Sequence, residues 1–262
     1  PLPPHRETMM WSNFCAVAAV LMASVAFSST NRPVIGILTL PNDHADVYPG
    51  RTYFPASYVK FVESGGARVV PIRYTDDEAS IRALLPKLNG FLFTGGGADF
   101  YQNGELTAFA QTALWILEEV RAAHANGESV PLWGTCLGFE LINVLAAGPN
   151  PNVLTGGWDS ENLTIPLTFT DAAPMSKLYG TAPKDAYATF ANKASTINNH
   201  HSAVAPADFD GNANLTSTFH VLSTNKDRNG KEFVSSIEGI ELPIFATQYH
   251  PEKAVWEWDT FE

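Results

Sequence analysis

A single cysteine between two glycines is the residue of this sequence best placed to act as a nucleophile. Residues 130–145 read VPLWGTCLGFELINVL, so Cys136 follows an apolar run and precedes a helical pattern, with Gly134 and Gly138 two positions away on either side. A lone buried thiol is in most proteins only a small apolar side chain. Here the glycines permit a tight strand-turn-helix in which larger side chains would collide with the neighbouring strand and helix. We therefore interpret Cys136 as a nucleophile at the tip of this turn, and we expect the helix that starts at Leu137 to favour the thiolate.

A cysteine nucleophile needs a general base and a group that orients that base. The segment 242–254, LPIFATQYHPEKA, predicts a buried strand that ends at His250, and Pro251 stops the strand. Glu252 lies two residues further on and can fix the tautomer of the imidazole ring. In isolation, His-Pro-Glu after a strand is more often an ordinary turn. Beside the cysteine turn we interpret His250 as the base and Glu252 as its orienting partner.

The patterns along the chain place these side chains at one edge of a sheet. Apolar runs predict strands at 33–40, 67–73, 90–94 and 130–133, and helical spacing predicts helices within 56–66, 76–88 and 105–125. Strands that alternate with helices form βαβ units, so we expect an α/β fold with a mainly parallel central sheet flanked by helices. Ligands bind beyond the carboxyl ends of such strands, where both Cys136 and the glycine turn 95–97 lie.

Composition limits the function classes. The 262 residues are 45% hydrophobic and 16% charged, which is enough to bury the core of one large domain without disulfides. The net charge of −11 argues against nucleic acid or an anionic membrane surface as the main partner. Only Cys15 and Cys136 are present, and Cys15 lies in an apolar leader, so we expect no disulfide within the mature chain.

The N-terminal segment predicts entry into the secretory pathway. Residues 14–27 are apolar and end in small residues, as in a signal peptide, so we expect a leader over residues 1–30 and a single domain over 31–262. The sequons at Asn162 and Asn214 are expected glycosylation sites. The expected destination is the lysosome, the vacuole or the extracellular space, with no membrane contact after cleavage. An uncleaved anchor is the alternative.

The motifs resemble those of a known family. The order Cys136, His250, Glu252 is similar to that of the class I glutamine amidotransferase superfamily. Within it, ASYVKFVESGGARVVPI, WGTCLGFE and QYHPEKAVWEW resemble the gamma-glutamyl hydrolases over about residues 33–258. The resemblance implies a flavodoxin-like three-layer sandwich with a cysteine nucleophile elbow, and it implies the same nucleophile, base and orienting roles for the three residues.

The resemblance also implies residues near the substrate. Glu140 matches a family position close to the substrate, and His200, after Asn199, matches a family histidine. Because His200 and His201 are adjacent, the sequence does not decide which of the two matches the family histidine. Substrate carboxylates call for basic groups, for which Arg51, Lys60 and Arg73 are candidates by location alone.

The implied activity is hydrolysis of gamma-glutamyl amide bonds in folyl or antifolate poly-gamma-glutamates. Cys136 attacks the gamma-carboxamide carbon, and backbone N–H groups of Leu137 and Gly96 hold the oxyanion. His250 then protonates the departing amine, and water cleaves the thioester. This chemistry requires no metal and no organic cofactor, and His200 lacks metal-like spacing to other ligands.

Two other functions stay open. The first is a glutaminase that passes ammonia to a synthetase, and the predicted leader argues against it. The second is a non-catalytic binding protein, and the intact triad argues against it. Family precedent implies a homodimer. The family pattern continues beyond AVWEWDTFE with a segment that ends in a long helix, so we expect the domain to be truncated at its C-terminus.

Overall fold

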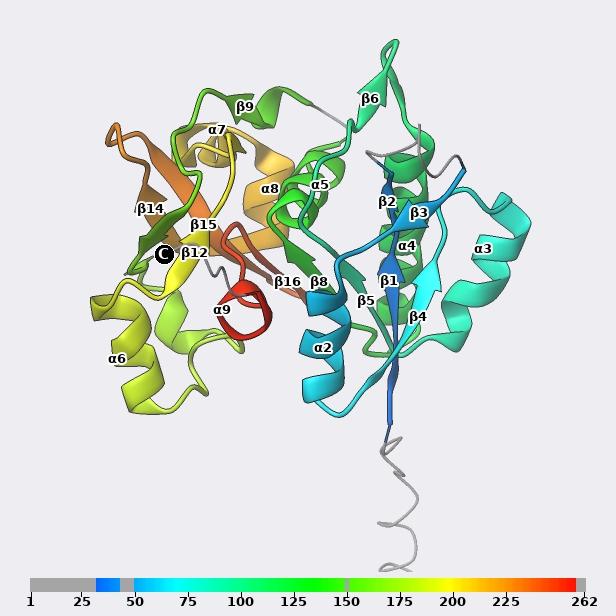
Figure 1. Ribbon diagram of the computed structural model, residues 1–262, viewed down its shortest axis with the longest axis horizontal. Helices are drawn as coiled ribbons and strands as arrows, with labels where there is room; N and C mark the ends of the chain where they lie inside the picture. The colour runs from blue at the N-terminus through cyan, green and yellow to red at the C-terminus, as the bar shows by residue number, and fades with distance from the viewer. Residues whose placement is uncertain (1–31, 43–49, 149–150, 258–262) are drawn as a thin grey trace, which may run out of the picture.

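The computed structural model describes residues 32–42, 50–148 and 151–257, which form an eight-stranded central sheet with helices on both faces (Figure 1). The leader predicted for residues 1–30 lies outside the described residues. The strand order is β11-β14-β15-β16-β8-β5-β1-β4. In chain order these strands are β1 (Val34–Leu38), β4 (Arg68–Ile72), β5 (Gly90–Phe93), β8 (Leu132–Thr135), β11 (Thr168–Phe169), β14 (Phe219–Lys226), β15 (Glu232–Gly239) and β16 (Ile244–Thr247).

Five adjacent strands of the sheet are parallel. β4, β1, β5, β8 and β16 pair in this way, so the α/β fold with a mainly parallel sheet is confirmed. β15, β14 and β11 extend the sheet with antiparallel pairs, and the sequence analysis did not predict this extension. The four strands predicted from apolar runs, together with the one ending before His250, make up the parallel part.

Helices cover the two faces of the sheet and complete a three-layer sandwich (Figure 1). One face carries α3 (Glu78–Leu84), α4 (Ala108–Ala125), α5 (Leu137–Ala146), α7 (Pro206–Asp210) and α8 (Ala213–Thr218), whose apolar residues join the largest buried cluster. The other face carries α2 (Ala56–Ser64), α6 (Lys184–Asn192) and α9 (Lys253–Trp256). Among the described residues, none of the helices is both long enough and apolar enough to span a membrane.

Helix α4 starts three residues later than the sequence pattern predicts. Glu105–Leu106 pair with Tyr101–Gln102 as the short strands β7 and β6, so these residues are unavailable to the helix. The Thr107 side chain then accepts a hydrogen bond from the backbone N–H of Ala110 and caps the helix. Periodicity alone did not reveal this hairpin.

Short elements connect the main ones. The remaining two-stranded pairs are β2 (Leu40–Pro41) with β3 (Thr52–Tyr53), β9 (Thr155–Gly156) with β13 (Ser202–Ala203), and β10 (Leu163–Ile165) with β12 (Thr196–Asn198). Three 3₁₀ turns, η1 to η3, occupy Leu85–Lys87, Pro151–Val153 and Ala173–Met175. The segment between β12 and β13 lies at the carboxyl edge of the sheet, where Asn199 contacts Cys136 and His200 lines the same pocket.

Candidate active site

Three neighbouring parallel strands end together and bring the predicted residues into one place. β16 pairs with β8 so that Thr247 lies opposite Thr135, and the N–H of Cys136 donates to the carbonyl of Thr247 at 2.8 Å. The turn after β5 brings Gly95 to the same edge, next to His250. The carboxyl edge of the sheet thus holds the cysteine, the histidine and the glycine turn, as the sequence predicts.

The turn at Cys136 is a nucleophile elbow. Cys136 has φ 50° and ψ −105°, a strained conformation for a residue with a side chain. A Cβ at Gly134 would lie 2.8 Å from the carbonyl oxygen of Gly138, and a Cβ at Gly138 would lie 2.3 Å from that of Phe93. Both flanking glycines are therefore required by close backbone packing, which is the physical reason given for them from the sequence.

The thiol of Cys136 is buried, with 5% of the residue exposed. Its Sγ lies 3.9 Å from both the carbonyl oxygen of Asn199 and Nε2 of Gln248. Burial raises the pKa of this thiol well above its ordinary value, the Glu140 carboxylate raises it further, and the N–H of Leu137 only partly opposes the rise. The first N–H of the helix therefore acts in the expected direction, towards the thiolate, but burial outweighs it in the free protein.

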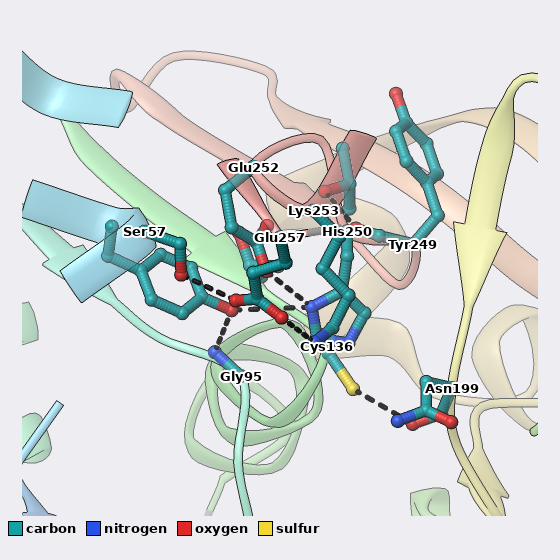
Figure 2. A network of polar contacts seen from close by, with 12 residues as sticks. Ser57, Gly95, Cys136, Asn199, Tyr249, His250, Glu252, Lys253 and Glu257 are labelled. Carbon is teal, nitrogen blue, oxygen red and sulfur yellow. Dashed lines mark hydrogen bonds and ion pairs between the residues drawn. The ribbon is translucent and has the colours of Figure 1, made fainter. Parts of the chain in front are cut away.

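His250 and Glu252 form a buried pair beside the cysteine (Figure 2). His250 Nδ1 lies 2.6 Å from Glu252 Oε1, and both residues are at most 5% exposed. A carboxylate oxygen accepts, so Nδ1 donates the hydrogen in this contact. Nε2 has no hydrogen-bond partner within the described part of the chain. The contact with Glu252 thus fixes the orientation of the ring and leaves Nε2 available for proton transfer.

Tyr58 joins this pair to the glycine turn. Its hydroxyl accepts the N–H of Gly95 at 2.7 Å and lies 3.4 Å from His250 Nδ1. A Cβ at Gly95 would lie 2.5 Å from Cε1 of His250, so only glycine fits there. Helical spacing predicted a helix at this place, and nothing in that pattern indicated where the hydroxyl of Tyr58 points.

The two predicted oxyanion donors, Gly96 and Leu137, line the larger pocket together with Cys136. Gly96 has φ 146°, and a Cβ there would lie 2.5 Å from Cδ1 of Leu40, so a side chain at this position would collide with Leu40. The N–H of Leu137 faces the sulfur of Cys136, where it lowers the pKa of the thiol in part. Because the N–H of Gly95 already binds Tyr58, the arrangement favours Gly96 as the donor from this turn.

Cys136 lies between two pockets. The larger pocket, of about 490 Å³, is lined by residues that include Phe100, Tyr101, Cys136, Leu137, Glu140 and His200. The smaller pocket, of about 190 Å³, is lined by residues that include Tyr58, Gly95, Cys136, His250, Glu252 and Lys253. Gly96 and Asn199 also line both pockets, so a substrate that reaches the sulfur can extend to either side of it.

Glu140 lies in the wall of the larger pocket. The residue is 6% exposed, and burial raises the pKa of its carboxyl to about 8, although the Gln248 amide donates to its Oε1 at 3.0 Å and lowers the pKa in part. Glu140 is therefore protonated at acidic and neutral pH. Gln248 was missed from the sequence, where the only signal was a polar residue within a buried strand.

The two adjacent histidines differ in burial. His200 is 4% exposed, its Nδ1 donates to the carbonyl of Ser202 at 2.9 Å, and its Nε2 lacks a partner among the described residues. Burial lowers the pKa of His200 to about 4, so its ring is neutral. His201 is exposed and lies 3.5 Å from Glu161. Both residues line the larger pocket, and the buried ring is the one at position 200.

The fold and this constellation define a class of protein: an α/β cysteine hydrolase with a glutamine amidotransferase-like sheet. The family model for peptidase C26 matches residues 33–252, and the chain belongs to this family of cysteine peptidases. Its relatives are named gamma-glutamyl hydrolases, and this chain is an enzyme of that type.

Three of these relatives illustrate the similarity. Gamma-glutamyl hydrolase B of Dictyostelium discoideum is 43% identical over 229 residues, covering 87% of this chain and 65% of the relative. The enzyme of Mus musculus is 36% identical over 245 residues, covering 93% of this chain and 74% of the relative. The enzyme of Homo sapiens is 34% identical over 251 residues, covering 95% and 76%. The chain thus spans about two thirds to three quarters of the length of these relatives.

A solved structure supports the fold alone. A putative GMP synthase component from Thermoplasma acidophilum superposes with a TM-score of 0.52 at 14% sequence identity, covering 84% of this chain and 85% of the other. The predicted glutamine amidotransferase-like architecture is thereby confirmed.

Proposed function

We propose that this protein hydrolyses gamma-glutamyl amide bonds of folate poly-gamma-glutamates through a gamma-glutamyl thioester on Cys136. The observation that carries the proposal is the position of Cys136 at a strained elbow between two pockets, beside the buried His250–Glu252 pair. The names of the relatives support the type of bond. The folate part of the substrate rests on the family resemblance.

The proposed reaction begins with Cys136 as a thiol. Because burial keeps Cys136 as a thiol, its proton passes to Nε2 of His250 as the sulfur bonds to the gamma-carbonyl carbon. Glu252 stabilises the imidazolium that forms. The N–H groups of Leu137 and Gly96 hold the oxyanion. When the C–N bond breaks, the imidazolium gives its proton to the leaving amine, and water then attacks the thioester with His250 as base.

The larger pocket is proposed to hold the acyl side of the substrate. Protonated Glu140 adds no negative charge at neutral or acidic pH, so it does not repel a polyanionic ligand, and its O–H can donate to a substrate oxygen. Nε2 of His200 can accept a substrate N–H. Both roles agree with the substrate contacts expected from the sequence.

The test is incubation with folate pentaglutamate, with the products identified by mass spectrometry. The proposal expects shortened folates and free glutamate or glutamate oligomers, and none from Cys136→Ala. Free glutamine is the parallel substrate. Release of ammonia from glutamine without cleavage of the pentaglutamate would support a glutaminase instead, and inactivity on both would support a binding protein.

We further propose that the protein follows the secretory route and is glycosylated. Asn162 supports this proposal, because it is exposed in a turn with φ 48°. Asn214 supports it less, because it lies in α8 and its Nδ2 donates to the carbonyl of Ala147 at 3.2 Å. Expression in a eukaryotic secretory host tests the idea: a glycosidase-sensitive mass that Asn162→Gln removes is expected, and the same preparation shows whether the proposed homodimer forms.

A further inference from the structure

One lysine reaches the reaction centre. Among the residues that the structure describes, Lys253 is the only Lys or Arg in the lining of either pocket. The candidates named from the sequence, Arg51, Lys60 and Arg73, are absent from both linings, and Arg73 pairs with Asp76 at 3.1 Å. The chain has a net charge of −11, so few cationic side chains are available to bind a polyanionic substrate, and Lys253 is the one that lines this site.

Lys253 is held in position by a neighbouring helix. Its Nζ contacts Oε2 of Glu257, and Oε1 of Glu257 accepts the hydroxyl of Ser57 on α2 at 2.5 Å (Figure 2). Burial tends to raise the pKa of Glu257, but the hydrogen bonds from Lys253 and Ser57 outweigh it and hold the pKa below its ordinary value. Glu257 is therefore an anion. An ammonium group has three N–H donors, and this contact uses one.

Lys253 is close enough to influence the nucleophile. Burial raises the pKa of the Cys136 thiol, and the positive charge of Lys253 opposes that rise. The three side chains of Cys136, His250 and Lys253 line the same small pocket. A ligand in this pocket therefore meets the sulfur, the proton donor and the ammonium group together.

The position of His250 decides which part of the substrate enters this pocket. The leaving amine must lie next to the group that protonates it, and His250 lines the small pocket but not the large one. The leaving group of a gamma-glutamyl peptide carries an alpha-carboxylate one carbon from that amine. The pocket of about 190 Å³ lies below the range of about 300–1,000 Å³ typical for drug-sized ligands, so it suits one amino acid.

We propose that the small pocket is the subsite of the leaving glutamate and that Lys253 binds its alpha-carboxylate. Glu257 and Ser57 orient the ammonium group, and the two remaining N–H donors face the ligand. This inference rests on the proposed function, since it names the group by which that site recognises its leaving residue. It makes Lys253 a specificity-determining residue.

The test compares two substrates that differ only in this carboxylate. One is 4-aminobenzoyl-glutamyl-gamma-glutamate, and the other carries an alpha-carboxamide on the leaving residue. Both are assayed with the wild-type chain, Lys253→Met, Lys253→Arg and the control Lys60→Met, which removes the same charge from an exposed position outside both pockets. Thermal midpoints show whether each variant is folded.

The wild type and Lys60→Met are expected to lose about 10- to 100-fold in kcat/KM on amidation, mainly through KM, as for the loss of a hydrogen bond between charged groups. Lys253→Met is expected to cleave both substrates with the same low kcat/KM. Lys253→Arg is expected to keep part of the preference for the alpha-carboxylate substrate. If Lys253→Met discriminates as the wild type does, the proposal is wrong. If the wild type cleaves neither substrate, the proposed function fails instead. In that case, calorimetric binding of glutamate and of its alpha-amide to the same variants decides on the subsite: a preference for glutamate that Lys253→Met abolishes supports it, and no such preference overturns it.

Discussion

Replacing Glu140 by glutamine should remove a large part of the pH dependence of stability. Burial raises the pKa of this carboxyl from its ordinary value of 4.5 to about 8, so between these values the folded protein holds a proton that the unfolded chain releases. Stability is therefore fully present below pH 4.5 and is lost as the pH rises to about 8. At about 1.36 kcal/mol per pH unit the total loss is about 5 kcal/mol, of which about 4 kcal/mol falls between pH 5 and pH 8. Glutamine matches the protonated acid in shape, still accepts from Gln248, and does not titrate.

The assay is urea unfolding of both proteins at intervals from pH 5 to pH 8.5. His200 also contributes, with the opposite sign, because burial lowers its pKa to about 4 and its contribution grows as the pH rises from 4 to 6.5. The contribution of His200 is the same in both proteins, so it cancels when their free energies of unfolding are subtracted. The contribution of the Cys136 thiol, which stays protonated in the folded state over this range, cancels in the same way. The free energies of unfolding should converge at pH 5 and favour Glu140→Gln by several kcal/mol at pH 8.5. Parallel profiles, with unchanged m-values, would refute the assignment of a raised pKa to Glu140.

Three further outcomes are expected. Cys136→Ala should abolish hydrolysis, with a loss of at least about 10⁴-fold in kcat, while its circular dichroism stays native; activity above a few per cent of the wild type would place the nucleophile elsewhere. Glu252→Gln should lower kcat about 10²- to 10⁴-fold with little change in KM, because the amide lacks the negative charge that stabilises the imidazolium and its NH2 group can donate to Nδ1 of His250 and favour the wrong tautomer; a change confined to KM would contradict that role. Gly138→Ala should cost about 1–3 kcal/mol or more in unfolding experiments, because its Cβ would lie 2.3 Å from a carbonyl oxygen of β5, whereas Gly156→Ala, with no atom within 4 Å, should stay within about 0.5 kcal/mol of the wild type.

Local signals in the sequence were sufficient for the parallel half of the fold and for the reacting residues. Each predicted parallel strand lies in an apolar run next to a helix, and Cys136 and His250 each end such a run, so sheet geometry brings them together. The antiparallel strands β14 and β15 are neighbours in the sequence. Their positions in the sheet, however, depend on pairing with β11 and β16, and no local sequence pattern encodes that pairing.

The residues that the sequence did not reveal act through contacts between distant segments. Ser57 meets Glu257 across 200 residues, and Tyr58 meets His250 across 192. The register of the two histidines was open because residues 199–201 belong to no helix or strand and have no periodicity. Burial, and with it the packing of the His200 ring against Phe233 at 4.8 Å between centroids, distinguishes His200 from the exposed His201.

The placement of Cys136 between two pockets also orders the events after the amide bond breaks. In the proposed reaction, the released amine leaves the small pocket while the acyl group stays attached to the sulfur in the larger one, so the vacated space beside His250 becomes the route by which water reaches the thioester. Any amine that fits this space competes with water for the same carbonyl. High concentrations of free amino acids should therefore divert part of the acyl group into new amides, so that transfer accompanies hydrolysis in a ratio set by occupancy of the small pocket.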